Sequence, residues 1–204
     1  MGSPFDPLSG AQIKGQAGAI ESQAFVGMFQ ESPELGLVAD VLAAVTDNGS
    51  EQIITTGFTN PTPARVVTAT SGGTAGDIGA IQVIVTGKNR GGETITETLP
   101  IFTADAATTV VGSKAFADVT SVTIPAHDGT GATTSIGSGN ALGLAHELIV
   151  NTVMDGMVYF GGTVESTEPT ITTSVTLLEE NTVTFDTTLD GSEVILFYVI
   201  PSNA

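Results

Sequence analysis

From Glu51 onward, short segments rich in Val, Ile and Thr alternate with turns rich in Gly, Asn and Asp. In residues 79–87 (GAIQVIVTG), the apolar Ile81, Val83 and Val85 occupy every second position. A period of two residues is typical of a β-strand with one buried face. Residues 89–92 (NRGG) then predict a tight hairpin that leads into a partner strand at 93–99.

The rest of the chain repeats this pattern of strand and turn. Asp-Gly pairs at 155–156 and 190–191 predict further hairpin turns. The last segment, 193–200, is apolar on both faces, which predicts a central position in a sheet. About ten short strands at regular spacing predict an all-β fold, either a sandwich or a Greek-key barrel. The predicted strands cover residues 65–70, 79–87, 93–99, 108–111, 114–124, 133–136, 142–153, 157–165, 170–178, 181–189 and 193–200.

One short helix is expected over residues 33–46. Ser32 can act as its N-cap, Pro33 suits the first helical position, and Glu34 favours the positive end of the helix dipole. Apolar residues follow at helical spacing at positions 35, 38, 42 and 45, and an Asn-Gly pair at 48–49 supplies a stop. We expect this helix to cover an open end of the β core, with docking onto a partner as the alternative.

Residues 1–31 are rich in Gly, Ala, Gln and Ser and contain isolated apolar residues. We interpret them as an extended arm that becomes ordered against a neighbouring molecule, with a disordered tail as the alternative. The chain would then comprise an N-terminal arm and helix (1–50) and a β-rich core domain (51–204), with a sub-boundary near 138–142 left open. The residues expected to contact a capsid or a neighbour are Phe5, Leu8, Ile13, Phe25 and Phe29.

The charge balance restricts the choice of partners. Acidic residues number 22 and basic residues 5, which gives a formal net charge of −17. The five bases are scattered, whereas nucleic-acid binding needs clustered cations that displace counterions from phosphate. We therefore expect no nucleic-acid partner and, for the same reason, no anionic membrane surface. The acidity suits an exposed outer surface, although it fits a generic acidic protein equally well.

The chain has no cysteine, which excludes disulfides and thiolate metal sites. The N-terminus lacks the basic and apolar regions of a secretory signal, and no apolar run approaches the ~20 residues of a membrane helix. We expect synthesis in the host cytoplasm, with the exterior reached by assembly or lysis.

No motif indicates an enzyme. The sequence contains two histidines, His127 and His146, but no G-x-S-x-G nucleophile motif. The pair Glu179 and Glu180 has no tryptophan to build a sugar-binding cleft around it. Fragments of calcium loops occur at 47–49 and 128–131, but the EF-hand pattern is absent, so a structural divalent ion is left open. No catalytic, cofactor-binding or metal-binding residue is predicted.

Three blocks resemble a module of virion proteins from tailed phages: residues 81–101, residues 110–124 with Lys114-Ala115-Phe116, and residues 135–148 with Leu142-Gly143-Leu144. Residues 166–200 are similar to the ending of the same proteins. Together these segments contain 85 of the 204 residues, all within 81–200, and residues 1–50 match least. None of the blocks is a catalytic motif.

The resemblance implies a head decoration, or cement, protein that binds the major capsid protein on the outer capsid surface and stabilises the lattice, as a trimer or dimer of itself. In this hypothesis the arm buries its apolar residues on neighbouring subunits, and deleting 1–31 releases the protein while leaving the core folded. The alternatives are a tail or head-fibre component and a displayed carbohydrate-binding adhesion module.

Overall fold

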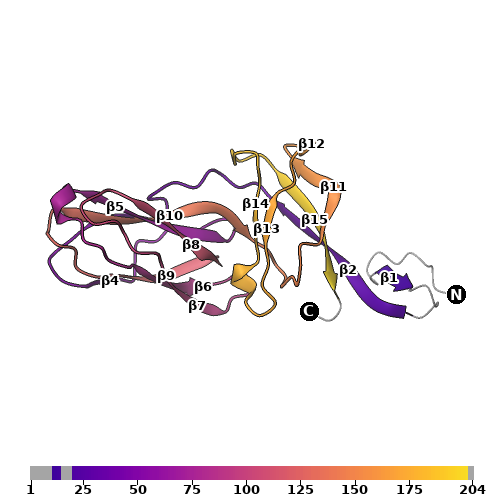
Figure 1. Ribbon diagram of the computed structural model, residues 1–204, viewed down its shortest axis with the longest axis horizontal. Helices are drawn as coiled ribbons and strands as arrows, with labels where there is room; N and C mark the ends of the chain where they lie inside the picture. Colours follow the sequence, from indigo (N-terminus) through magenta and orange to yellow (C-terminus); the bar gives the residue numbers. More distant parts are fainter. Residues whose placement is uncertain (1–10, 15–19, 202–204) are drawn as a thin grey trace.

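The computed structural model describes residues 11–14 and 20–201 of the 204-residue chain, with side chains from Phe25 to Ile200. Within these residues the chain forms fifteen strands and two single-turn 3-10 helices. Every strand pairing is antiparallel, and the strands form three sheets, A, B and C (Figure 1). The predicted all-β class is confirmed, and several of the strands are only two or three residues long.

Sheets B and C pack face to face as a sandwich at one end of the elongated molecule (Figure 1). Their facing sides supply the first core, which includes Val67, Val85, Phe116 and Ile136, each fully buried. Sheet B has the order β13-β14-β10-β5-β8, with β3 also paired to β10, and sheet C has the order β4-β9-β6-β7. Their strands are β3 (Leu42–Thr46), β4 (Gln52–Ile54), β5 (Arg65–Gly73), β6 (Ile84–Lys88), β7 (Thr94–Thr98), β8 (Thr109–Phe116), β9 (Asp118–Ile124), β10 (Ala132–Gly143), β13 (Thr170–Thr172) and β14 (Thr182–Thr184).

Sheet A lies at the other end of the molecule (Figure 1). Its order is β1-β2-β15-β11-β12, and one of its faces closes a second core against β14 and the loops around it. Leu142, Val183, Leu196 and Tyr198 are completely buried in this core. The strands are β1 (Ala11–Lys14), β2 (Ile20–Glu31), β11 (Val153–Phe160), β12 (Thr163–Val164) and β15 (Val194–Pro201), and the 3-10 helices are η1 (Ala75–Asp77) and η2 (Leu178–Glu180).

A single strand, β10, belongs to both cores. Ile136 points into the first core and Leu142 into the second. One edge of β10 pairs with β5 along most of its length, and the other edge pairs with β3 near Thr133 and with β14 at Leu142. The strand runs without a break through residues 138–142, and the change from one core to the other takes place along it.

The helix predicted over residues 33–46 is wrong. This segment instead follows the edge of β10: Val41 donates its N–H to Ile136 O, Ser138 donates to Leu37 O, and β3 continues the pairing. The approach is close because Gly137 faces Leu37 and Gly36 faces Ser138, each without a Cβ in the way. The open edge of β10 supplies backbone hydrogen bonds that outweigh the local helix signals, and the β-branched residue Val45 suits strand β3.

Other predictions also differ from the structure. The strand predicted over 114–124 is divided between β8 and β9, and those predicted over 79–87, 170–178 and 181–189 are shorter. The predicted strand 142–153 ends at Gly143, because buried Asn181 holds the following loop by accepting the Leu148 N–H. Asp155-Gly156 is no hairpin turn but an irregularity inside β11, where Gly156 has φ +68°. The predicted arm also extends too far, since Ala24–Glu31 pairs with β15 and lies inside sheet A.

Gly137→Ala should destabilise the fold, because a Cβ at this position meets the backbone of Leu37 and Val38. We expect a loss of about 1–3 kcal/mol in the free energy of unfolding, measured by urea denaturation. Gly76→Ala is the matched control, because nothing lies within 4 Å of its Cβ and it changes the unfolded chain in the same way. Equal stability of the two variants would show that the contact between segment 36–38 and β10 is loose.

Candidate interaction surface

The five predicted contact residues have different locations. Phe5 and Leu8 lie outside the described residues, and Ile13 lies in β1, where side chains are not described. Phe25 is 41% exposed near the start of the part of β2 that pairs with β15. Phe29 is only 2% exposed and belongs to the second core, so its prediction as a neighbour-contacting residue is corrected.

Phe29 also packs against Arg90, a residue that does not belong to sheet A. The Arg90 guanidinium carbon lies 5.4 Å from the centre of the Phe29 ring, an attractive arrangement of cation and aromatic face. The same guanidinium donates to Gly143 O at 3.1 Å and to the Glu31 carboxylate at 2.8 Å. Arg90 lies in the hairpin between β6 and β7, so its contacts with Phe29 and Glu31 link sheet C to sheet A.

The first half of β2 continues beyond the rest of sheet A as a two-stranded ribbon with β1 (Figure 1). Ala24 marks the change, because it pairs with Pro201 on one side and with Ala11 on the other. In the part of the chain that the structure describes, residues 20–23 pair with β1 alone. An isolated two-stranded ribbon is marginally stable in water, so we expect it to require further contacts.

Sheet A has a second face, directed away from the core. Alternation along β15 places Val194, Leu196 and Tyr198 in the core and the residues between them on the opposite side. The register with β2, β11 and β12 then identifies which side chains share that side. We call it the outer face of sheet A, and its members are Val26, Met28, Gln30, Met157, Tyr159, Val164, Ile195, Phe197 and Val199.

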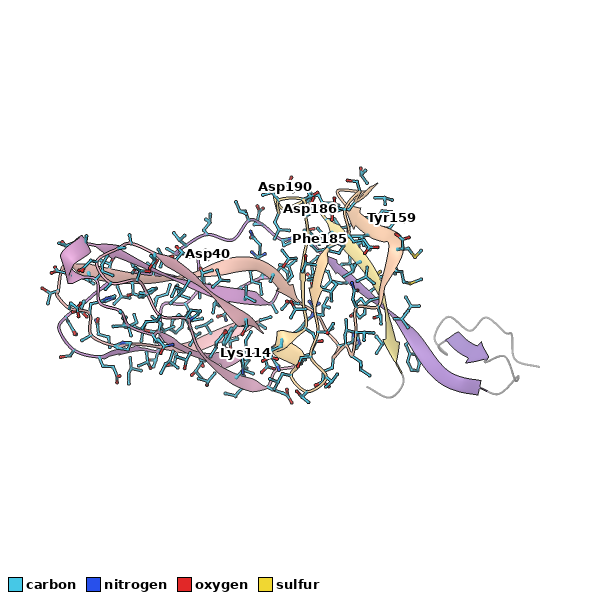
Figure 2. The ribbon with its side chains drawn as sticks, viewed as in Figure 1. Asp40, Lys114, Tyr159, Phe185, Asp186 and Asp190 are labelled. Atoms are coloured by element: carbon cyan, nitrogen blue, oxygen red, sulfur yellow. The ribbon has the colours of Figure 1, made fainter. Side chains whose placement is uncertain are left out.

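The outer face is apolar and carries no charged side chain among these nine residues. Val26 and Met28 are 56% and 54% exposed, although both lie in the part of β2 that pairs with β15. Val164 of β12 is 47% exposed. Its single amide, Gln30, donates to the Glu193 carboxylate at 2.6 Å. Figure 2 shows Tyr159 on the other side of β11 from Phe185 of the second core. A contiguous apolar surface of this kind marks an interaction site in soluble proteins.

The histidines have structural contacts. His127 is 7% exposed, stacks on Phe102, and accepts the Gly79 N–H at its Nδ1. Its Nε2 therefore carries the proton and donates to Thr134 Oγ1 at 2.8 Å. Burial lowers the pKa of His127, and the charges of Asp47 and Asp128 oppose this shift.

His146 lies on the wall of an open groove of about 370 Å³ between the β6–β7 hairpin and the loop after β10. Its Nδ1 lies 2.7 Å from the hydroxyl oxygen of buried Tyr198. Burial lowers the pKa of His146, and the charge of Arg90 lowers it further. Glu93 and Glu147 also line the groove, so it presents carboxylates beside the imidazole.

Arg65 is the most deeply buried of the bases whose side chains the structure describes, at 3% exposure. Its Nη1 donates to Glu34 O at 2.9 Å, whereas Nε and Nη2 have no hydrogen-bond partner. The nearby Asp40 carboxylate already accepts hydrogen bonds from Ser138 and Leu37. Burial lowers the pKa of Arg65, and the charge of Asp40 opposes this shift. Beside them lies a cavity of about 100 Å³, and the contacts of Arg65 and Asp40 hold segment 34–40 against β10.

Comparison with known proteins found no matching family model, curated protein or solved structure. Among the described residues, no three His, Asp or Glu side chains are grouped so that they could hold a metal ion. In that same part of the chain, no helix is long and apolar enough to cross a membrane.

Sequence reasoning did not identify the outer face of sheet A, although its signal is present. Residues 194–200 are apolar at consecutive positions, so the segment 193–200 was predicted to be apolar on both faces and central in a sheet. The strand is central, between β2 and β11, but the described elements of the chain cover only one of its faces. The apolar residues at 26 and 28 were interpreted as part of an arm, so they were not assigned to the same surface.

Acidification from pH 7 to about 5 should destabilise the protein through its histidines. Both have a pKa below the ordinary 6.5, so the unfolded chain binds more protons below that pH and the folded state loses stability as pH falls. Urea denaturation at several pH values should show this decline, and His127→Gln combined with His146→Gln should reduce its slope. An unchanged slope in the double variant would contradict the assignment.

The carboxylate of Glu179 titrates in a lower pH range than the histidines, so its protonation does not interfere with the histidine test. Burial alone would raise its pKa, but hydrogen bonds from its own backbone and from Asn89, with the charge of Lys114, give a net lowering from 4.5. The stability that it contributes is present above that value and is lost only at lower pH.

Proposed function

We propose that this protein is a structural subunit of a tailed-phage particle, a decoration protein that binds the outer surface of the major capsid shell and stabilises it. The observation that carries the proposal is the β1–β2 ribbon, which projects from sheet A (Figure 1). On the N-terminal side of Ala24, the described residues of β2 pair with β1 and with no other strand. Such a ribbon is suited to lie on a neighbouring subunit, where main-chain and side-chain contacts supply the stability that it lacks alone.

The segment before the ribbon contains apolar Phe5 and Leu8. Burial of each such side chain on a neighbour is worth about 1.5–3 kcal/mol before the cost of ordering the chain. Several copies attached side by side would then be held tightly through many weak contacts. The net charge of −17 supports an outward-facing position, because the surface repels nucleic acid and other acidic proteins.

The blocks that resemble phage virion proteins have structural roles here. Lys114, labelled in Figure 2, pairs with Glu179 of η2 at 3.4 Å. Phe116 is buried in the sandwich core, and Ala115 beside it is also buried. Leu142 and Leu144 are buried in or beside β10, and a Cβ at Gly143 between them would meet Ala115. These blocks specify rigid packing, which suits a protein that braces a lattice rather than one that changes shape.

Deleting residues 1–19 should abolish attachment to the shell and leave the fold intact. The deletion removes β1 and keeps Ala24–Glu31 paired with β15, with Phe29 in its core. We expect retention on tailless shells purified without the protein to fall at least about tenfold, measured by co-sedimentation, with a nearly unchanged melting temperature. Normal retention of the truncated protein would refute the attachment mechanism.

The larger deletion of residues 1–31 is not a suitable variant. It removes all of β2, which pairs with eight residues of β15, and it removes Phe29 from the second core. Loss of a buried phenylalanine alone costs about 3–5 kcal/mol, so this protein would lose binding through unfolding. Binding of the full chain to purified tails but not to tailless shells would instead place the protein in the tail.

A further inference from the structure

We infer that the outer face of sheet A packs against the same face of a second copy of this chain. The inference rests on that face alone and does not depend on attachment to a capsid. Two sheets that pack face to face lie about 10 Å apart and interdigitate their side chains, as the layers of a β-sandwich do. Such a contact is two-fold symmetric, because each copy contributes the same patch.

The chemistry of the outer face favours a second copy over a charged partner. The nine residues of the face include no charged side chain, and the carboxylate at its edge, Glu193, already accepts a hydrogen bond from the amide of Gln30. Recognition must therefore come from apolar side chains that fit together. No described segment of this chain covers Met28, Phe197 and Val199, and a second copy offers them a sheet of matching pleat and composition.

The size of the face fits a dimer. The β2–β15 pairing covers eight residues, or roughly 25 Å at 3.3 Å per residue, and the sheet is roughly 20 Å wide at the end where the two residues of β12 make it four-stranded. These two lengths give a flat area on the order of 500 Å². The solvent-accessible area of the same patch is larger than this flat area, because side chains project from it. Stable complexes bury about 800 Å² per partner, so we expect a dissociation constant on the order of micromolar.

Salt dependence separates self-association from docking onto a basic partner. Each copy carries a formal charge of −17, so two copies repel each other through their acidic surroundings. Added salt screens this repulsion and should strengthen the dimer. Attachment to a basic surface would weaken under the same change.

The test compares the full-length protein with Met28→Glu and Val199→Glu by analytical ultracentrifugation at about 1–100 µM. These variants place a carboxylate in the middle of the outer face of sheet A. We expect the wild-type protein to dimerise more tightly as NaCl rises from about 50 to 500 mM, and each variant to dissociate at least about tenfold more readily. Ile53→Glu is the control, because Ile53 is an equally exposed apolar residue, 63% accessible, on β4 of sheet C.

Three results would overturn the inference: a wild-type monomer throughout this range, an equal effect of Ile53→Glu, or an oligomer that the outer-face variants leave intact. Circular dichroism confirms that each variant is folded. The truncation of residues 1–19 keeps the whole outer face, so it should dimerise normally even where it no longer binds shells. Failure of the attachment proposal and failure of this one are therefore distinguishable.

Discussion

The rest of the structure depends on the shared use of β10 by two hydrophobic cores. Its twelve residues carry Ile136 into the sandwich of sheets B and C and Leu142 into the core beneath sheet A. Glycines on this strand allow neighbouring segments to approach closely: Leu37 lies over Gly137, and the Val66 side chain lies against Gly139. A strand that is hydrogen-bonded on both edges cannot bend freely, so the two ends of the molecule are held in one arrangement.

A set of polar contacts reinforces this arrangement where the two cores meet. Buried Glu179 of η2 accepts a hydrogen bond from Asn89 at 3.2 Å and pairs with Lys114. Arg90, on the same hairpin as Asn89, reaches Gly143 O and Glu31 of sheet A. Because the buried carboxylate is compensated by both an amide and an ammonium group, it stabilises the junction instead of destabilising it. The ribbon and the outer face of sheet A are thus presented by a rigid body.

The sequence predicted those features that depend on local pattern. Alternation identified the hairpin of β6 and β7, and apolar residues on both faces of 193–200 identified the central place of β15; both are confirmed. It failed where a distant backbone decides: the helix signals at Ser32–Glu34 were genuine, but the open edge of β10 competes for the same residues. Phe29 and Phe25 illustrate the limit for the site. Four residues apart on one strand, one is in the core and the other is half exposed, because pairing with β15 ends near Phe25. The outer face of sheet A needs the register of four strands, which no single segment reveals.

Sheet A therefore combines the two features by which a subunit can join an assembly, a projecting ribbon and an uncovered apolar face, while the rest of the molecule is an acidic, firmly packed rod. The most direct test of this account is a cryo-EM map of the intact particle that carries the protein. The account predicts density for the molecule on the head, with the β1–β2 ribbon lying on the shell, the outer faces of sheet A from two copies in contact, and β4 and η1 directed away from the shell. A map in which the protein lies on the tail, or in which the sandwich end touches the shell while sheet A is free in solvent, would contradict it.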